Sequence, residues 1–193
     1  PLEEGEVTIS RSLSTLTYPA NVMLVAAMNP CRCGYFGSDQ KECQCSRREV
    51  ERYRNKISGP LMDRIDLHVE VPTVPYRELK KERRGEPSSV VRRRVQSARD
   101  RQARRFRGAG QHSNSQMHPA DLREYCEIGE AGHDLLEKVV DKFGMSARAY
   151  DRILKVARTI ADLEGSDEIR TPHLSEAVQY RTLDRDLKDS HAA

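Results

Sequence analysis

Four cysteines crowded into one short segment are the clearest candidates for chemistry in this 193-residue sequence. They follow the pattern C-x-C, nine residues, C-x-C, at Cys31, Cys33, Cys43 and Cys45. Four thiolates in a loop of this length could surround a tetrahedral Zn²⁺ ion. A one-residue gap is tight for two ligands of one ion, so free structural thiols and disulfides stay open as alternatives. No secretory signal is visible, which favours a reduced, cytoplasmic setting over disulfides.

Two polar residues near these cysteines could contact a phosphate group. Asn29 directly follows the apolar run Val22–Met28, at the carboxyl end of a predicted buried strand, where α/β folds commonly place ligand sites. A turn-forming role before proline would also explain this asparagine. Arg64 lies in the stretch SGPLMDRIDL, and its planar guanidinium suits a phosphate. An ion pair with Asp63 or Asp66 is the alternative for Arg64.

Arg148 is a third candidate because of its expected place in a helix. Ser146 is predicted to cap that helix, so Arg148 falls in the first turn, where the helix dipole disfavours a cation by a few tenths of a kcal/mol. Free backbone N–H groups at the same end favour anions. Either a nearby phosphate or simple exposure to solvent would explain an arginine there.

Charge is unevenly distributed along the chain. The net charge is only +3, but the segment 92–107 contains eight arginines and a single acid, Asp100. Such a run suggests an anionic partner, either a phosphate or a nucleic acid, although a solvated helix face is an equally good explanation. No apolar run approaches the roughly 18 to 20 residues that cross a bilayer, which excludes a membrane-spanning protein. The sequence does not begin with Met, and we expect a piece of a longer chain.

The elements that must position these residues divide into an α/β part and an all-α part. Alternating residues in Val7–Arg11 and the stretch Leu16–Ala20 predict a β-hairpin, followed by the buried strand Val22–Met28. Ser46 is a plausible N-cap for a helix that continues to Ile57. Asp66–Val71 alternates like another strand.

The all-α part begins with the basic segment Val90–Arg107, predicted to be a helix with a thin apolar stripe. Four further helices are predicted at Ala120–Cys126, Glu130–Phe143, Ser146–Glu164 and Pro172–Arg181. The domain organisation we predict is therefore an α/β core over residues 1–73, a linker over 74–89 and a helical domain over 90–193.

Several ordered motifs together resemble one protein family. The stretches GEVTISR, LVAAMNPCRCG, CQCS, RYRNKISGPLMDRIDLHVEV and SARAYDRILKVARTIADLEG are similar to the bacterial magnesium-chelatase-like AAA+ ATPases of the YifB/ComM competence-protein group. The resemblance extends from Gly5 to about Arg181. It implies a fold: the carboxyl-terminal part of an AAA+ core with a pre-sensor 1 β-hairpin, followed by a helical lid domain.

The same resemblance implies ATP and Mg²⁺ as cofactors of a longer parent ATPase. The sequence contains neither a GxxxxGK[ST] phosphate loop nor an acidic Walker B strand, so most ligands of the nucleotide would lie outside this chain. We therefore expect the chain alone to bind ATP weakly or not at all and to be inactive in hydrolysis.

Roles for individual residues follow from the resemblance by motif. Asn29 matches sensor 1, Arg64 matches the arginine finger supplied across a subunit interface, and Arg148 matches sensor 2 in the lid. Arg11, near the tip of the hairpin, would then face a nucleic-acid backbone or pack on a neighbouring subunit. The cysteines belong to the family pattern, and any zinc bound by them would be structural.

Three functions remain open at this point. The first is a ring motor, expected to be a homohexamer, that couples ATP hydrolysis to the processing of DNA in recombination or competence. The second is a chelatase-type ATPase that drives metal insertion into a tetrapyrrole, which the same fold would serve equally well. The third is a non-enzymatic, zinc-bearing module that binds another protein.

Overall fold

The chain divides into two units, and the boundary between them in the sequence falls between Arg64 and Ile65. The structure is a computed structural model, and it describes residues 2–72, 74, 76 and 85–181. The linker predicted at 74–89 falls mostly outside the described residues. None of the helices within the described ranges has both the length and the apolar character needed to span a lipid bilayer.

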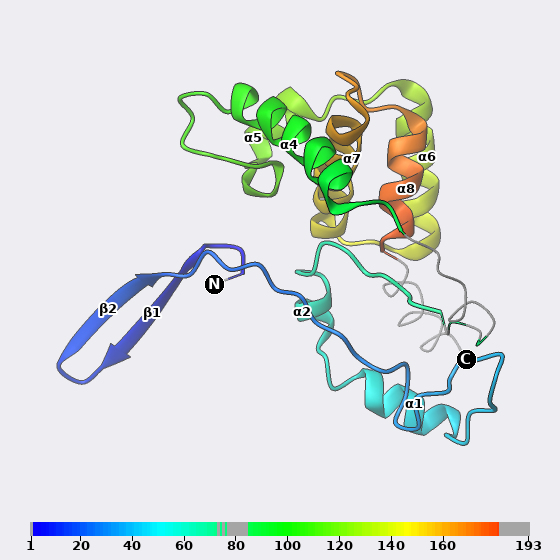
Figure 1. The fold of residues 1–193 in the computed structure, drawn as a ribbon. Helices are drawn as coiled ribbons and strands as arrows, with labels where there is room; N and C mark the ends of the chain where they lie inside the picture. The colour runs from blue at the N-terminus through cyan, green and yellow to red at the C-terminus, as the bar shows by residue number, and fades with distance from the viewer. Residues whose placement is uncertain (1, 73, 75, 77–84, 182–193) are drawn as a thin grey trace. The chain divides into compact units, whose positions relative to one another are not determined.

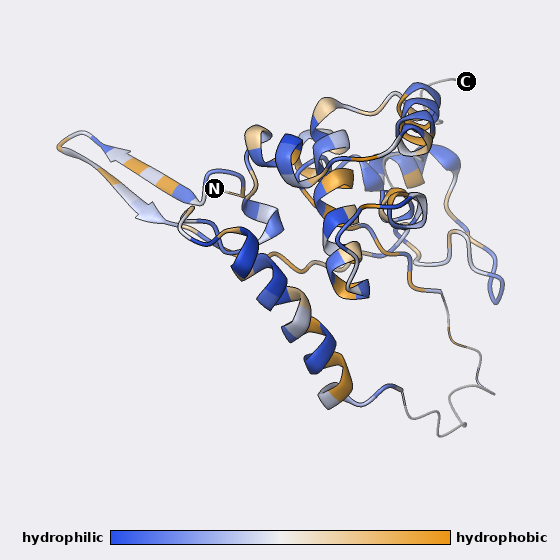
Figure 2. Cartoon of the chain, turned by 90° about the horizontal axis from the view of Figure 1, so that it is seen from above, coloured by the Kyte–Doolittle hydropathy of each residue, from blue (hydrophilic) through white to orange (hydrophobic). Residues whose placement is uncertain are grey.

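The amino-terminal unit begins with a β-hairpin. Strands β1 (Glu6–Arg11) and β2 (Ser14–Pro19) pair antiparallel, which confirms the predicted pairing of these two segments. Thr8 lies opposite Thr17, and their hydroxyl oxygens are 2.9 Å apart. Val7, Ile9, Leu16 and Tyr18 lie on one face of the hairpin and are exposed to solvent. In Figure 2 apolar and polar residues alternate along one strand of the hairpin.

The buried strand predicted at Val22–Met28 is not observed. This segment has no regular structure, and its side chains are exposed, with Val25 at 83% and Met23 at 91%. A strand covered on both faces requires neighbouring strands, and the one sheet in the described residues is the two-stranded hairpin. The segment is apolar, as the prediction assumed, but the described residues supply no neighbouring strand with which it could pair.

Two helices complete the amino-terminal unit. α1 (Arg47–Arg54) begins after Ser46, whose side chain accepts a hydrogen bond from the Glu49 backbone while the Glu49 carboxylate accepts one from the Ser46 backbone. This capping box confirms Ser46 as the N-cap, although the helix ends before the expected Ile57. The short α2 (Gly59–Met62) follows.

The second unit is helical, as predicted, and its helix ends lie within a few residues of the expected positions. It contains α4 (Ser88–Arg105), the 3₁₀ turn η1 (Asn114–Gln116), α5 (Pro119–Tyr125), α6 (Glu130–Phe143), α7 (Ala147–Glu164) and α8 (Thr171–Gln179). α7 packs against α4, α5, η1 and α8 (Figure 1). Its inner residues Ile153, Ala157 and Ala161 are completely buried.

A buried ionic cluster lies beside this hydrophobic core. The Asp162 carboxylate accepts two hydrogen bonds from the Arg105 guanidinium, at 2.8 and 2.6 Å, and one from the Asn114 amide at 2.9 Å. Arg158 is within 3.3 Å of the same carboxylate. Burial raises the pKa of Asp162, but the bonds from Arg105 and Asn114 outweigh it and hold that pKa below its ordinary value.

The second predicted strand, Asp66–Val71, is also absent. This segment forms no ladder, but Asp66 makes an ion pair with Arg152 of α7. The backbone N–H of His68 donates to the Tyr180 carbonyl at 2.7 Å, and the His68 side chain is buried. The Asp66 carboxylate and the His68 N–H thus bind groups of the helical unit rather than a neighbouring strand.

Candidate functional site

The structure brings all four clustered cysteines together. Their sulfur atoms lie within 4.8 Å of one another. The Sγ of Cys31 is 3.4 Å from that of Cys33 and 3.7 Å from that of Cys43, while Cys33 and Cys43 are 3.5 Å apart. A disulfide bond is about 2.05 Å long, and all four thiols are free. Cys31 is fully buried and the other three are half-buried, so the cluster could hold a metal ion.

The thiols of the cluster differ in acidity. The backbone N–H of Tyr35 donates to the Cys33 sulfur and is the main reason that the pKa of this thiol falls to about 6. The backbone N–H of Cys45 favours the thiolate of Cys43, but desolvation and the neighbouring thiols outweigh it and raise the pKa of Cys43 to about 12. Negative charge on one sulfur therefore suppresses ionisation of the next one.

The loop that carries the first two cysteines turns back beside Asn29. Its turn closes with a hydrogen bond from the Gly34 N–H to the Cys31 carbonyl at 3.1 Å, and Gly34 adopts φ +84°, a conformation that other residues rarely take. A Cβ at Gly34 would lie 3.9 Å from the Asn29 amide nitrogen. Arg54, at the end of α1, donates to the Pro30 carbonyl at 3.3 Å and so connects the residue after Asn29 to that helix.

Arg64 is half-buried just after α2. Its Nε donates to the Glu3 carboxylate at 3.1 Å, and a terminal nitrogen donates to the Pro60 carbonyl at 2.9 Å. Arg64 therefore forms an ion pair, but with Glu3, a partner that the sequence analysis did not name. Glu3 lies 61 residues away along the chain, and no local spacing could have indicated it.

Arg148 and Arg11 both lie on exposed surfaces. Ser146 caps α7 by accepting a hydrogen bond from the Ala149 backbone, which confirms that Arg148 falls in the first turn of that helix. Arg11 is the last residue of β1 and pairs with Ser14 across the hairpin end. Asn29 and Arg64 belong to the amino-terminal unit, whereas Arg148 belongs to the helical unit. The position of each residue is therefore described relative to its own unit.

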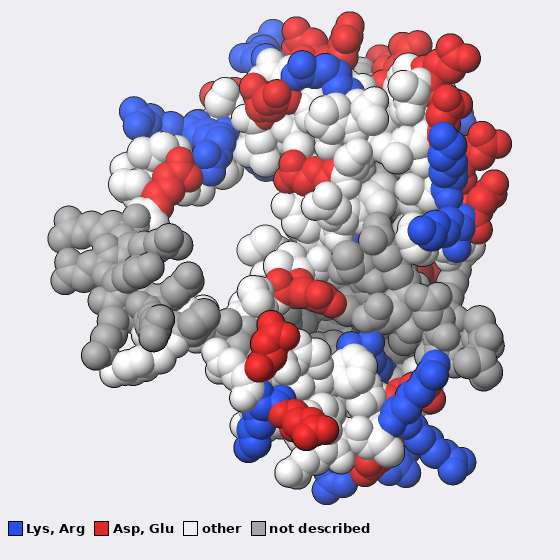
Figure 3. All heavy atoms as spheres, turned by 90° about the vertical axis from the view of Figure 1, so that its right-hand side faces the viewer, with Lys and Arg blue, Asp and Glu red and all other residues white. Residues whose placement is uncertain are grey.

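The basic segment is less cationic than its sequence indicates. Arg105 is committed to Asp162, Arg101 binds Asp167 at 2.6 Å, and Arg94 binds Glu86 at 2.9 Å. The remaining five arginines of the segment are exposed: Arg92, Arg93, Arg99, Arg104 and Arg107. On the face drawn in Figure 3, acidic and basic side chains are interspersed.

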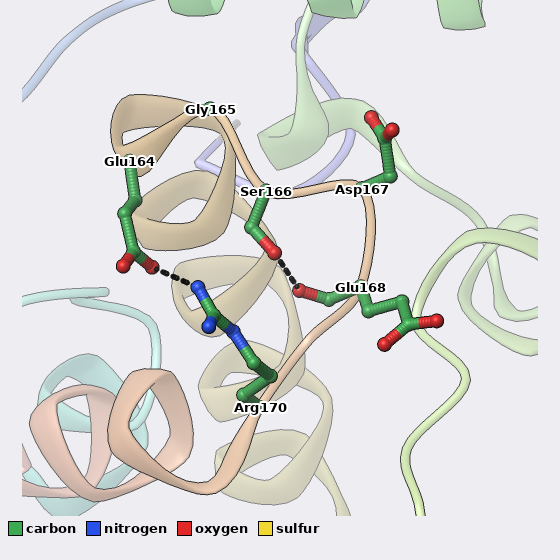
Figure 4. Close-up of a pocket in the computed structure, with 6 residues that line it drawn as sticks. All are labelled: Glu164, Gly165, Ser166, Asp167, Glu168 and Arg170. Atoms are coloured by element: carbon green, nitrogen blue, oxygen red, sulfur yellow. Dashed lines mark hydrogen bonds and ion pairs between the residues drawn. The ribbon is translucent and has the colours of Figure 1, made fainter.

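A shallow polar depression of about 450 Å³ lies where α7 leads into α8. In Figure 4 the Arg170 guanidinium points toward Glu164, and the two groups are 3.0 Å apart. The Ser166 hydroxyl donates to the Glu168 carbonyl at 2.8 Å, and His173 also contacts Glu164. Because these groups satisfy one another and none of the predicted site residues is among them, we assign this depression a structural role.

Comparison with known proteins identifies the family. Residues 1–79 match the family model of the magnesium chelatase subunit ChlI, and residues 85–181 match that of the carboxyl-terminal part of the same subunit. The chain therefore belongs to the magnesium-chelatase-like family.

Curated relatives agree with this assignment. The chain is 42% identical over 189 residues to the competence protein ComM of Haemophilus influenzae, covering 97% of this chain and 36% of that protein. It is 40% identical over 186 residues to YifB of Escherichia coli, and 39% identical to YifB of Salmonella typhimurium, each time covering 96% of this chain and 36% of the relative. The chain thus spans about a third of the length of these relatives.

Proposed function

We propose that this chain is the nucleotide-sensing part of a ring-forming ATPase that couples ATP hydrolysis to the processing of DNA. The observation that carries the proposal is the family match, together with the relative that is named a competence protein. The residues assigned by motif are compatible with it: Asn29 and Arg148 are exposed, and Arg64 is half-buried just after α2.

In this proposal the three residues act on the terminal phosphate of ATP. Asn29 orients the attacking water through its amide, and Arg148 reports the nucleotide to the helical unit. Arg64 is supplied to the site of the neighbouring subunit, where it stabilises charge in the transition state; such arginine fingers raise rates by roughly 10³ to 10⁵. Its present bond to Glu3 must then be exchanged for a phosphate when the ring assembles.

Contact with DNA would come from exposed arginines on two elements. Arg11 lies at the end of the hairpin, and five exposed arginines lie in and just after α4. Phosphate contacts made by such side chains release counterions, so binding should weaken steeply as salt increases.

The cofactors of the proposed reaction are ATP and Mg²⁺, bound largely by residues outside this chain. A Zn²⁺ ion at the cysteine cluster would be structural, because four protein ligands leave no open position for a reacting group. We propose a cytoplasmic location, where the five thiols stay reduced, and a homo-oligomer, with a hexamer as the expected form.

A second candidate is favoured by the description of the matched family models, which is that of a magnesium chelatase subunit. In that case ATP hydrolysis would drive insertion of a metal ion into a tetrapyrrole, and DNA would have no effect on the rate.

The test is the ATPase rate of the full-length protein, with and without single-stranded or branched DNA. We expect stimulation by DNA in the wild type and a loss of about 10³-fold or more in Arg64→Ala. Arg47→Ala is the matched control, because Arg47 is an exposed arginine of the same unit with a surface ion pair to Glu51. A rate indifferent to DNA would support the chelatase alternative, and equal rates in both variants would exclude Arg64 as the finger.

A further inference from the structure

We infer that Cys31, Cys33, Cys43 and Cys45 form a mononuclear, structural Zn²⁺ site. The first support is geometric. Zn–S bonds of about 2.3 Å in a tetrahedron place the sulfur atoms about 3.8 Å apart. The three distances of 3.4, 3.5 and 3.7 Å, and the 4.8 Å limit that holds for all four sulfurs, are close to that value. Only small side-chain shifts separate this arrangement from a coordination sphere.

The same spacing selects a single ion over an iron–sulfur cluster. A cluster places several iron atoms and sulfides between its cysteine ligands and needs sulfur atoms that are farther apart. A pair of disulfides is equally poor, because each bond would shorten one contact to about 2.05 Å and break the compact arrangement of the four sulfurs. Among single ions, an all-thiolate tetrahedral site suits zinc.

Hydrogen bonds from the backbone to the sulfur atoms are the second support for a metal site. N–H groups of Gly34 and Phe36 point at the Cys31 sulfur, and those of Tyr35 and Gln44 point at the Cys33 sulfur. Four thiolates around one divalent cation leave an excess of negative charge, which such N–H donors offset. Donors of this kind orient and hold the ligands of metal centres.

The site would join the Asn29 segment, the loop that carries the cysteines and α1, all within the amino-terminal unit. The first cysteine pair follows Asn29 and Pro30, and the second pair leads directly into the N-cap of α1 at Ser46. Arg54 at the far end of α1 donates to Pro30, and its guanidinium lies 5.1 Å from the centre of the Phe36 ring. The ion therefore closes a loop that holds the Asn29 segment against α1. Any effect of the ion on catalysis rests on the proposed role of Asn29, whereas the assignment of the metal site does not depend on that role.

Metal analysis of the full-length protein tests the assignment without using its activity. We expect about one zinc ion per chain in the wild type and less than about a tenth in Cys31→Ser/Cys43→Ser. Cys126→Ala is the control, because Cys126 is a free, buried cysteine of the helical unit outside the cluster, and it should keep its zinc. Wild-type protein without zinc, with iron in its place, or with disulfides at these positions would overturn the inference.

A second variant covers the case in which the serine variant fails to fold. Cys33→His keeps four ligands, since three cysteines and one histidine are a common zinc set. After replacement of zinc by Co²⁺, wild type should show the absorption bands of a tetrahedral all-thiolate site, and Cys33→His should still bind the metal with those bands shifted. Identical spectra in the two proteins would contradict coordination by Cys33. A full-length protein without DNA-dependent ATPase activity would contradict the proposed function, but the zinc content and the Co²⁺ spectra would still test the metal site.

Discussion

The two units of this chain are ordered by different means. The helical unit is built on α7, whose inner residues Ile153, Ala157 and Ala161 have no exposed surface. In the amino-terminal unit the apolar residues are mostly exposed, as in Val22 at 65% and Leu24 at 53%. Local order there comes from the hairpin ladder, the capping box of α1 and the cysteine cluster.

This contrast shows that apolar composition produces a core only where partners are available. The apolar stripe of an amphipathic helix is buried by other helices of the same unit. A strand that is apolar on both faces needs neighbouring strands as well as covering layers, and an isolated two-stranded hairpin is marginal in water. We therefore expect substitutions of equal size to affect stability strongly in the helical unit and weakly, or locally, in the amino-terminal unit.

The largest effect should follow Asp162→Ala in the helical unit. Removal of this buried carboxylate leaves the Arg105 and Arg158 guanidinium groups without their counter-charge, and breaking a buried ion pair in this way costs about 3 to 5 kcal/mol. The measurement is the free energy of unfolding in urea, followed by helical circular dichroism. Asp167→Ala is the control; it removes the exposed partner of Arg101 and should cost about 1 kcal/mol or less. Equal losses in both would show that burial of the cluster is unimportant.

Acid should destabilise the helical unit through the same carboxylate. The pKa of Asp162 is lower in the folded chain than its ordinary value of 3.8, so its contribution is fully present above that value and is lost as pH falls below it. Unfolding measured from pH 6 downward should therefore show a loss in the wild type that begins near pH 4. In Asp162→Asn, which cannot titrate, that part of the pH dependence should be missing, and parallel curves would refute the assignment.

The helices could be predicted from sequence because their signals are local. The stripe of α7 and the caps Ser46 and Ser146 depend on residues within a turn or two of one another, and the structure confirms them. The prediction of strands at Val22–Met28 and Asp66–Val71 was wrong. A strand needs neighbouring strands from other parts of a chain, and the described residues supply none for these two segments.

The candidate site was predictable in part for the same reason. Cysteine spacing indicated that four thiols could meet, and they do. The partner of Arg64 was missed because Glu3 is distant in sequence. The sequence analysis also missed the buried ionic cluster around Asp162, although one signal for it existed. Arg158 and Asp162 are charged residues at i, i+4 spacing that continue the apolar stripe of α7.

Gly132→Ala should cost an intermediate amount because α6 and α8 approach closely at this glycine. A Cβ there would lie 2.9 Å from Leu174 Cδ1 and 3.2 Å from Ile128 Cβ, and overpacking of this kind costs about 1 to 3 kcal/mol. Alanine is the better helix former by about 1 kcal/mol, so propensity opposes the clash. Unfolding in urea decides between them, and the reverse change at the adjacent exposed position, Ala131→Gly, is the control. If propensity alone mattered, the two changes would have opposite signs, whereas we expect both to destabilise.

The smallest effects, at the two helix caps, compare the units most directly. Ser46 and Ser146 both accept a hydrogen bond from the backbone of the third helical residue, and losing such a cap costs about 1 kcal/mol. In Ser146→Ala this loss should lower the free energy of unfolding of the whole helical unit, because α7 packs against most of it. In Ser46→Ala it should appear as faster amide hydrogen exchange confined to α1 and to the cysteine loop that the inferred ion joins to it, since few buried contacts transmit the change further. Aspartate at either position should restore the cap. Spread of the Ser46→Ala effect as far as the β1–β2 hairpin would mean that the amino-terminal unit is as cooperative as the helical one.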